Sequence, residues 1–273
     1  MNVAALSPPP LSSDWLSAAL LGLVEGLTEF LPVSSTGHLL LAEQLLAPRS
    51  EAFNVIIQSG AVLAVLAAFR SRLGDLWATR EQPATRRYLG QLALAFAITA
   101  VGGLLLKAFG LKLPETAGPV AWATLVGGVL FLAVEAWLVR WGQQPRAELG
   151  WLTAAAVGCG QLLAAAFPGA SRSGSTILLA LVLGASRPAA TEFSFLLGLP
   201  TLLAAAAVEG LHALGGHGPA EPWGPLLLAS AVSLVTAFGV VRWLLAFVRH
   251  HTFIPFALYR LALGGLLLWW AHG

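Results

Sequence analysis

Long apolar runs, two of which are broken by a proline and several hydroxyl side chains, dominate this sequence. Of its 273 residues, 57% are hydrophobic and 10% are charged, whereas roughly a quarter of the residues of a soluble domain are charged. The runs contain helix-forming residues and glycine without strand-like alternation, which favours a helical bundle over a membrane barrel. The chain is therefore expected to be an all-α integral membrane protein, and its composition does not indicate nucleic-acid binding.

The first residues, 1–13, are expected to form a short N-terminal tail. They contain three consecutive prolines and no basic region before an apolar stretch, which does not fit a cleaved signal peptide. Residues 14–273 are expected to form one membrane domain. The single cysteine, Cys159, rules out an internal disulfide, and its apolar neighbours indicate a small packing residue rather than a nucleophile.

The first broken run covers residues 14–47. Its two apolar segments, 15–30 and 37–47, flank Pro32 and the hydroxyl residues that follow it. The second segment has 11 residues, whereas a full membrane crossing needs about 20. Because proline removes a backbone donor and restricts the residue before it, the helix is interrupted there. We therefore expect a re-entrant helix–loop–helix hairpin with a polar tip buried in protein.

Residues 150–183 repeat this pattern in the second half of the chain. An apolar segment at 150–167 is followed by a polar break from Pro168 to Thr176 and a short helix to about Leu183. A second re-entrant hairpin is expected here. Six further apolar segments are long enough to cross a membrane, and they lie near residues 53–69, 88–110, 119–140, 191–208, 225–248 and 253–271.

The distribution of lysine and arginine sets the expected topology. The polar loop at 70–87 carries five arginines and should be cytoplasmic. If both hairpins are re-entrant, this loop lies on the same side as the loops at 141–150, 186–190 and 249–252, and nine of the 15 basic residues lie in or beside these four loops. The loop at 209–224 and both termini are then outside.

Each half of the chain then contains one hairpin and three spans. Because the number of crossings is odd, the second half is inverted relative to the first. The expected fold is six transmembrane helices plus two re-entrant hairpins, arranged as an inverted-topology repeat of about 14–140 and 150–273. In such repeats the broken helices meet near the middle of the membrane and form the binding site.

The two expected tips carry polar side chains that indicate a site for phosphate. Each short second helix begins after a turn with glycine and hydroxyl residues, so free backbone N–H groups and the positive end of the helix dipole face the site. Arg172 adds a planar, permanently charged group that matches phosphate oxygens. The candidates are Ser34, Ser35, Thr36, Gly37, His38, Ser171, Arg172, Ser173, Gly174, Ser175 and Thr176.

Two acids precede the first tip. Glu25 and Glu29 are four residues apart, so a helix would place both carboxylates on one face, where they repel unless a proton or a cation relieves them. They would also repel a bare phosphate. A bound divalent cation, Mg²⁺ or Ca²⁺, would hold both acids and the phosphate, and His38 could transfer a proton or attack.

Each of these residues also has a structural interpretation. Hydroxyl residues at a turn can cap helices, the two glutamates could line a proton path, and Arg172 could be a counter-ion. Their combination in apolar sequence favours a catalytic or transport site over a structural network. For other polar positions, Glu135, Glu192 and Arg260, pairing or snorkelling is expected and no chemistry is assigned.

Two segments closely resemble the signatures of the undecaprenyl-diphosphate phosphatase family, whose members are also called bacitracin-resistance proteins. They read Glu25-Gly-Leu-Thr-Glu-Phe-Leu-Pro-Val-Ser-Ser-Thr-Gly-His38 and Pro168-Gly-Ala-Ser-Arg-Ser-Gly-Ser-Thr176. Both are long and specific. Shorter matches occur at 53–60, 192–200 and 252–260, whereas residues 71–150 match mainly in hydropathy. Ala100 and Ala170 differ from the residues common in the family, but neither change removes a chemical group that the reaction needs.

The resemblance implies a multi-pass enzyme of the bacterial inner membrane, with termini and site opening toward the periplasm. It would hydrolyse undecaprenyl diphosphate to undecaprenyl phosphate and inorganic phosphate, recycle this lipid carrier for cell-wall synthesis and confer bacitracin resistance. The chain-length preference, the metal identity and the formation of a homodimer are left open. By the same matching, the catalytic residues are Glu25, Glu29, Ser35, His38 and Arg172.

The expected roles divide these five residues into three groups. Glu25 and Glu29 handle the metal and protons, Arg172 and the hairpin amides bind the diphosphate, and Ser35 or His38 is the nucleophile. Direct attack by water also stays open. The alternative function is a membrane transporter or flippase of a phosphorylated polyprenyl lipid, which shares the binding site but needs the acids and the histidine only for charge compensation. A phosphatidic-acid-type phosphatase is disfavoured because no Lys-x₆-Arg-Pro element is present.

Overall fold

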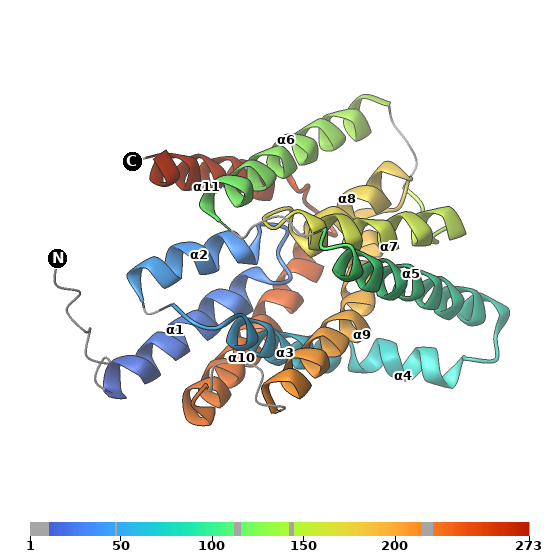
Figure 1. Ribbon diagram of the computed structural model, residues 1–273. Coiled ribbons are helices and arrows are strands. Elements are labelled where there is room, and N and C mark those ends of the chain that lie inside the picture. Colours follow the sequence, from blue (N-terminus) through green and yellow to red (C-terminus); the bar gives the residue numbers. More distant parts are fainter. Residues whose placement is uncertain (1–10, 47, 112–115, 142–144, 215–220, 273) are drawn as a thin grey trace.

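The computed structural model describes residues 11–46, 48–111, 116–141, 145–214 and 221–272. All of the long regular elements in these ranges are helices (Figure 1). They are α1 (Leu11–Thr28), α2 (Ser35–Leu45), α3 (Glu51–Ala68), α4 (Arg70–Ala78), α5 (Pro83–Ala108), α6 (Ala117–Trp141), α7 (Trp151–Ala166), α8 (Arg172–Val182), α9 (Arg187–Leu214), α10 (Trp223–Phe247) and α11 (Ile254–His272). The all-α prediction is therefore confirmed for the described part of the chain.

Length and hydropathy identify the helices that can cross a membrane. Within the described residues, α5, α6, α9, α10 and α11 pass this test, and α3 with α4 makes a sixth candidate if a pair bent by 61° counts as one span. The expected spans coincide with these helices. The shorter apolar helices α7 and α8 fall below a full span. The chain is therefore a multi-pass membrane protein.

One expected loop is wrong. Residues 70–87 were expected to form a polar loop, but α4 occupies 70–78 and α5 already begins at Pro83. The reason is tertiary packing, since Leu76 is buried in the main core and Leu73 packs against it. An apolar stripe on an otherwise polar segment is enough to stabilise a short helix when it has a core to cover. In the same way α9 continues to Leu214 and shortens the expected loop at 209–224.

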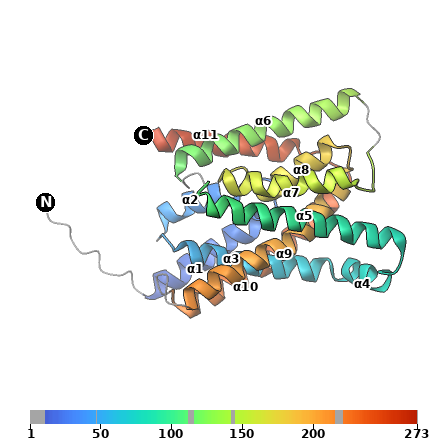
Figure 2. The same cartoon turned by 45° about the vertical axis from the view of Figure 1, so that its right-hand side comes forward.

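The two broken helices occur where the prolines predicted them. α1 and α2 are separated by residues 29–34, and α7 and α8 by residues 167–171. The second break is shorter than expected, because α8 begins at Arg172 and includes the segment up to Thr176. In Figures 1 and 2 both breaks point into the middle of the bundle, where segments far apart in the sequence meet.

The helices pack in a pattern that repeats between the two halves. If α1, α2, α3, α5 and α6 are matched in order with α7, α8, α9, α10 and α11, the contact of α1 with α10 corresponds to that of α7 with α5. Likewise, the contact of α2 with α11 corresponds to that of α8 with α6. α3 packs on α9, and α6 packs on α11. Each of these pairs consists of two equivalent helices, as expected for helices that lie beside a two-fold axis. Figure 2 shows α6 and α11 side by side at one edge of the bundle.

Two buried clusters fix the breaks and the helix ends around them. Phe30, in the first break, contacts Phe195 of α9 edge-on with ring centroids 5.0 Å apart, and both are fully buried. At the expected cytoplasmic side, the fully buried Glu135 forms an ion pair with Arg187 and accepts a hydrogen bond from Phe253 N at 2.8 Å. The pairing expected for Glu135 is thus confirmed, and it joins α6 and α9 to the residue that precedes α11.

Candidate functional site

The short helices α2 and α8 begin in the same way. Their N-cap residues, Ser34 and Ser171, have φ angles of 75° and 68° and are the only non-glycine residues with positive φ in the described ranges. The Ser34 hydroxyl accepts a hydrogen bond from Gly37 N at 3.3 Å, and the Ser171 hydroxyl accepts one from Gly174 N at 3.1 Å. A positive φ angle strains the backbone of a serine and persists only where the surrounding structure enforces it, which happens most often at functional sites. The same N-cap conformation at both breaks therefore indicates a functional site.

The first residue of each short helix binds the same carboxylate. Ser35 begins α2 and donates its hydroxyl hydrogen to Glu29 Oε2 at 2.9 Å. Arg172 begins α8 and donates from Nη2 at 3.2 Å and from Nε at 3.3 Å to Glu29 Oε1. The two tips expected from the sequence therefore meet, and Glu29 lies between them.

Arg172 is held on two further sides. Its guanidinium lies over the ring of Phe30, 5.3 Å from the centroid. Gly198 of α9 lies on the other side, where a Cβ atom would come within 2.6 Å of Nη1. Nη1 is buried and, within the described part of the chain, has no hydrogen-bond partner. One edge of this guanidinium thus binds Glu29, while another donor is left for a ligand.

Glu25 lies one helical turn before Glu29 and is fully buried. Neither of its carboxylate oxygens has a hydrogen-bond partner among the described residues, which is costly for a charged group unless a cation or proton compensates it. No cluster of three or more His, Cys, Asp or Glu side chains occurs in the described residues. The donors are therefore two carboxylates and nearby hydroxyls, a set that fits an oxygen-preferring divalent cation completing its shell with water or phosphate oxygens.

His38 lies one turn into α2 with defined partners on both ring nitrogens. Its Nδ1 is 2.7 Å from Ser34 O, and its Nε2 is 2.7 Å from the Tyr259 hydroxyl. The two rings also stack, with centroids 5.5 Å apart. Because a carbonyl oxygen can only accept, Nδ1 carries the hydrogen, and Nε2 of the neutral ring accepts from Tyr259. Sequence reasoning assigned Tyr259 no role, although it stands in a short segment that resembles the family.

The other candidate hydroxyl side chains differ in their burial and in their hydrogen-bond partners within the protein. Ser173 is fully buried and its hydroxyl lies 3.0 Å from Leu31 O of the first break, so it ties the tips together. Thr176 is also fully buried and its hydroxyl contacts Arg172 O at 2.8 Å and Ser194 Oγ at 2.6 Å. These two side chains hold the site, whereas Thr36 is half-buried at the start of α2.

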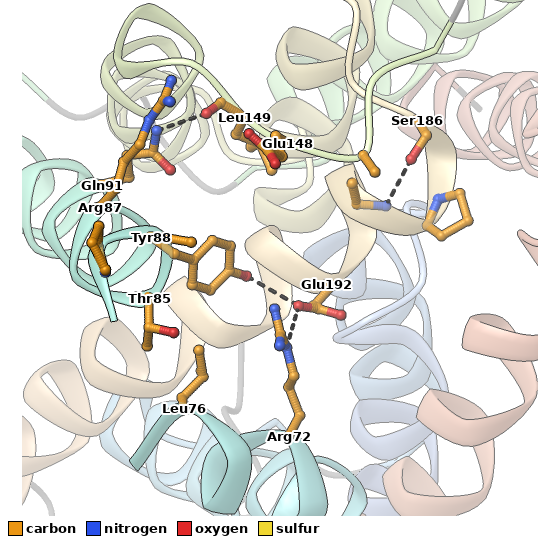
Figure 3. Close-up of a pocket in the computed structure, with 15 residues that line it drawn as sticks. Arg72, Leu76, Thr85, Arg87, Tyr88, Gln91, Glu148, Leu149, Ser186 and Glu192 are labelled. Carbon is orange, nitrogen blue, oxygen red and sulfur yellow. Dashed lines mark hydrogen bonds and ion pairs between the residues drawn. The ribbon is translucent and has the colours of Figure 1, made fainter. Parts of the chain in front are cut away.

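A cavity in the described part of the chain lies away from the two tips. It has a volume of about 600 Å³ between α4, the start of α5, residues 147–149 and the start of α9. In Figure 3 Arg72 and Tyr88 both point toward Glu192 at its wall, with Arg72 Nε 2.8 Å from Glu192 Oε1. This ion pair confirms the pairing expected for Glu192. None of the candidate site residues lines this cavity, and the chemistry is therefore assigned to the closely packed tips.

Comparisons with known proteins agree on one family. A family model described as "Bacitracin resistance protein BacA" matches residues 18–266. A protein of Rhizobium etli (strain CIAT 652) named undecaprenyl-diphosphatase is 49% identical over 257 residues, covering 93% of this chain and 96% of the relative. One of Xanthomonas axonopodis pv. citri with the same name is 47% identical over 262 residues, covering 94% of this chain and 97% of the relative.

Proposed function

The chain belongs to the BacA family of bacitracin resistance proteins, and from this premise we propose that it hydrolyses undecaprenyl diphosphate at the two hairpin tips. The enzyme is an undecaprenyl-diphosphatase, a membrane hydrolase that serves cell-wall synthesis and bacitracin resistance. The single observation that carries this proposal is Glu29, which binds Ser35 of one tip and Arg172 of the other.

Ser35, Glu29 and Arg172 supply the elements of nucleophilic catalysis. Such catalysis needs a nucleophile, an adjacent base and a group that orients the base. The Ser35 oxygen attacks the terminal phosphorus, its proton passes to Glu29, and the bond from that phosphorus to the bridging oxygen breaks. Undecaprenyl phosphate leaves. Water then attacks the phosphoserine, the bond from phosphorus to the Ser35 oxygen breaks, and Glu29 returns its proton to that oxygen as inorganic phosphate is released.

The other groups of the site bind charge and move protons. The first N–H groups of α2 and α8 precede the first i→i−4 bond of each helix and can donate to phosphate oxygens, and Arg172 Nη1 adds a charged donor. His38 can take a proton from the attacking water once Tyr259 releases its Nε2. A divalent cation held by Glu25 and Glu29 would supply positive charge to the diphosphate.

The membrane arrangement is part of the proposal. Six spans with two re-entrant hairpins are supported by the helix lengths, by the bent pair α3 and α4, and by the repeated packing of the two halves. The arginines of α4 and the start of α5 favour a cytoplasmic location for these ends. The open ends of α1 and α2 then face the periplasm of an inner-membrane protein, where the diphosphate would enter.

Phosphate release from undecaprenyl diphosphate by the purified protein in detergent tests this function. Substrate-dependent release of inorganic phosphate, with undecaprenyl phosphate as the second product, is the expected result. A protein that binds the lipid without releasing phosphate, in the presence of Mg²⁺ or Ca²⁺, would instead favour the transporter. The contacts around Ser35 argue for the hydrolase, because a carrier does not need a nucleophile paired with a base.

A further inference from the structure

Arg260 of α11 is fully buried and binds only backbone oxygens. It was expected to pair or to snorkel, and it does neither: no acidic side chain lies within ion-pair distance in the described part of the chain. Its guanidinium donates to five carbonyl oxygens at 3.1–3.3 Å, those of Pro32, Ala123, Thr124, Gly169 and Ala170.

These acceptors come from both breaks and from one span. Pro32 lies two residues before the N-cap Ser34 of α2, and Gly169 lies two residues before the N-cap Ser171 of α8. Arg260 therefore binds equivalent carbonyls in the two halves. Ala170 of the second break is a further acceptor. The last two, Ala123 and Thr124 of α6, fix the guanidinium to a long helix next to α11 (Figure 1).

Gly127 of α6 provides the space for this side chain. A Cβ atom at Gly127 would come within 2.0 Å of Arg260 Nη2, and one at Gly174 of α8 within 3.3 Å of Nη1. The guanidinium thus lies directly beside the first turn of α8. The close packing and the hydrogen bonds around the buried Arg260 guanidinium leave it no room to move without loss of contacts, so its position is strongly fixed.

We propose that Arg260 is a positioning residue for the diphosphatase site, which sets the spacing of the two tips by binding both breaks. This inference rests on the proposed function. Holding both tips at one spacing directs the free N–H groups of α2 and α8, and Arg172, at the same diphosphate. No carboxylate in the described ranges pairs with the buried positive charge of Arg260, so this charge also favours binding of an anion at the tips.

Two substitutions separate this role from general support of the fold. Arg260→Lys keeps the charge but cannot bind five carbonyls, and Gly127→Ala keeps the arginine but displaces it. Their matched controls are Arg242→Lys, an exposed arginine of α10, and Gly118→Ala, a glycine of α6 whose Cβ atom would meet nothing within 4 Å.

The experiment measures hydrogen exchange in both breaks and the kinetics of phosphate release from undecaprenyl diphosphate. Arg260→Lys and Gly127→Ala are expected to speed backbone exchange in residues 31–36 and 168–173 together. They should lower kcat by about a hundredfold, the effect of an ångström-scale displacement, while KM changes only a few-fold. The two controls should behave as wild type.

The two readouts have separate consequences. Faster exchange in both breaks, with no phosphate release by wild type, would support the role of Arg260 but contradict the diphosphatase function. Unchanged exchange and unchanged kcat in the folded variants, or faster exchange in one break alone, would overturn the inference. If Arg260→Lys cannot be purified, the exchange and the kcat of Gly127→Ala decide whether the inference holds. Loss of folded protein in both variants would also overturn it, because Arg260 would then only support folding.

Discussion

Gly198 of α9 lies so close to Arg172 that a Cβ atom there would come within 2.6 Å of Nη1. The glycine leaves room for the guanidinium to reach Glu29 from above the ring of Phe30. A helix in the second half of the chain therefore determines how the second tip contacts an acid from the first. This relationship cannot be read from the neighbours of either residue in the sequence.

Gly198→Ala should displace Arg172 and impair the reaction without removing any catalytic group. We expect kcat/KM for phosphate release to fall by about tenfold to a hundredfold, as for displacements of about an ångström. The matched control is Gly210→Ala on the same helix, where a Cβ atom would meet nothing within 4 Å. Equal activity of the two variants would show that Arg172 does not need its observed position.

The covalent step predicts a phosphoenzyme on Ser35. Single-turnover reactions with a substrate labelled on the terminal phosphate are quenched in acid, which preserves phosphoserine and destroys phosphohistidine. The label should be found in a peptide that contains Ser35, and His38→Ala should increase it by slowing hydrolysis. A label that survives only in a parallel alkaline quench, which preserves phosphohistidine, or phosphate release with no labelled peptide in either protein, would contradict Ser35 as the nucleophile.

Tyr259→Phe removes the hydroxyl that contacts His38 Nε2 but keeps the stacked ring. The imidazole then loses one of its two positioning hydrogen bonds. Steady-state phosphate release should therefore fall by about threefold to tenfold, a modest part of the 10²- to 10⁴-fold typical of general acid–base catalysis. The matched control is Tyr88→Phe, which changes the chain's other tyrosine at the distant cavity. A larger loss in the control would argue against a role of Tyr259 at the site.

Chelation tests the interpretation of the two buried acids. Because the structure shows no hydrogen-bond partner for either oxygen of Glu25 in the ranges that it describes, we expect EDTA to abolish phosphate release and Mg²⁺ or Ca²⁺ to restore it. Glu25→Gln should raise the cation concentration needed for half-maximal activity, whereas Glu192→Gln, which changes an acid paired with Arg72, should not. Full activity after exhaustive chelation would contradict a bound divalent cation.

Segment length and proline position were sufficient to predict most of the fold. The short second segments after Pro32 and Pro168 predicted the two breaks, and long apolar runs predicted the spans, because these features act locally on the backbone. The helix α4 was missed because its stability comes from burying Leu76 in a core formed by other helices. Local sequence shows a polar segment there, and tertiary contacts decide its conformation.

The sequence also indicated which residues gather at the site, but not all of their partners. The two broken hairpins with hydroxyl-rich turns predicted that the tips meet at one site, and the structure places Glu29 between them. Arg260 was misread because its position along a helix does not reveal which face meets a neighbour, and its carbonyl partners come from three distant segments. Ser173 and Thr176 have the residue types of a phosphate site but are fully buried in contacts within the protein.

The most direct test of the central claim is the kcat for undecaprenyl diphosphate of Glu29→Gln beside Glu192→Gln. Glu29 connects Ser35 and Arg172, so its amide variant should lose about 10²-fold or more of the wild-type kcat, as expected for loss of a catalytic base. Glu192→Gln alters an acid at the other cavity that is likewise paired with an arginine, and it should retain activity. Wild-type kcat in folded Glu29→Gln would contradict a reaction centred between the two hairpin tips.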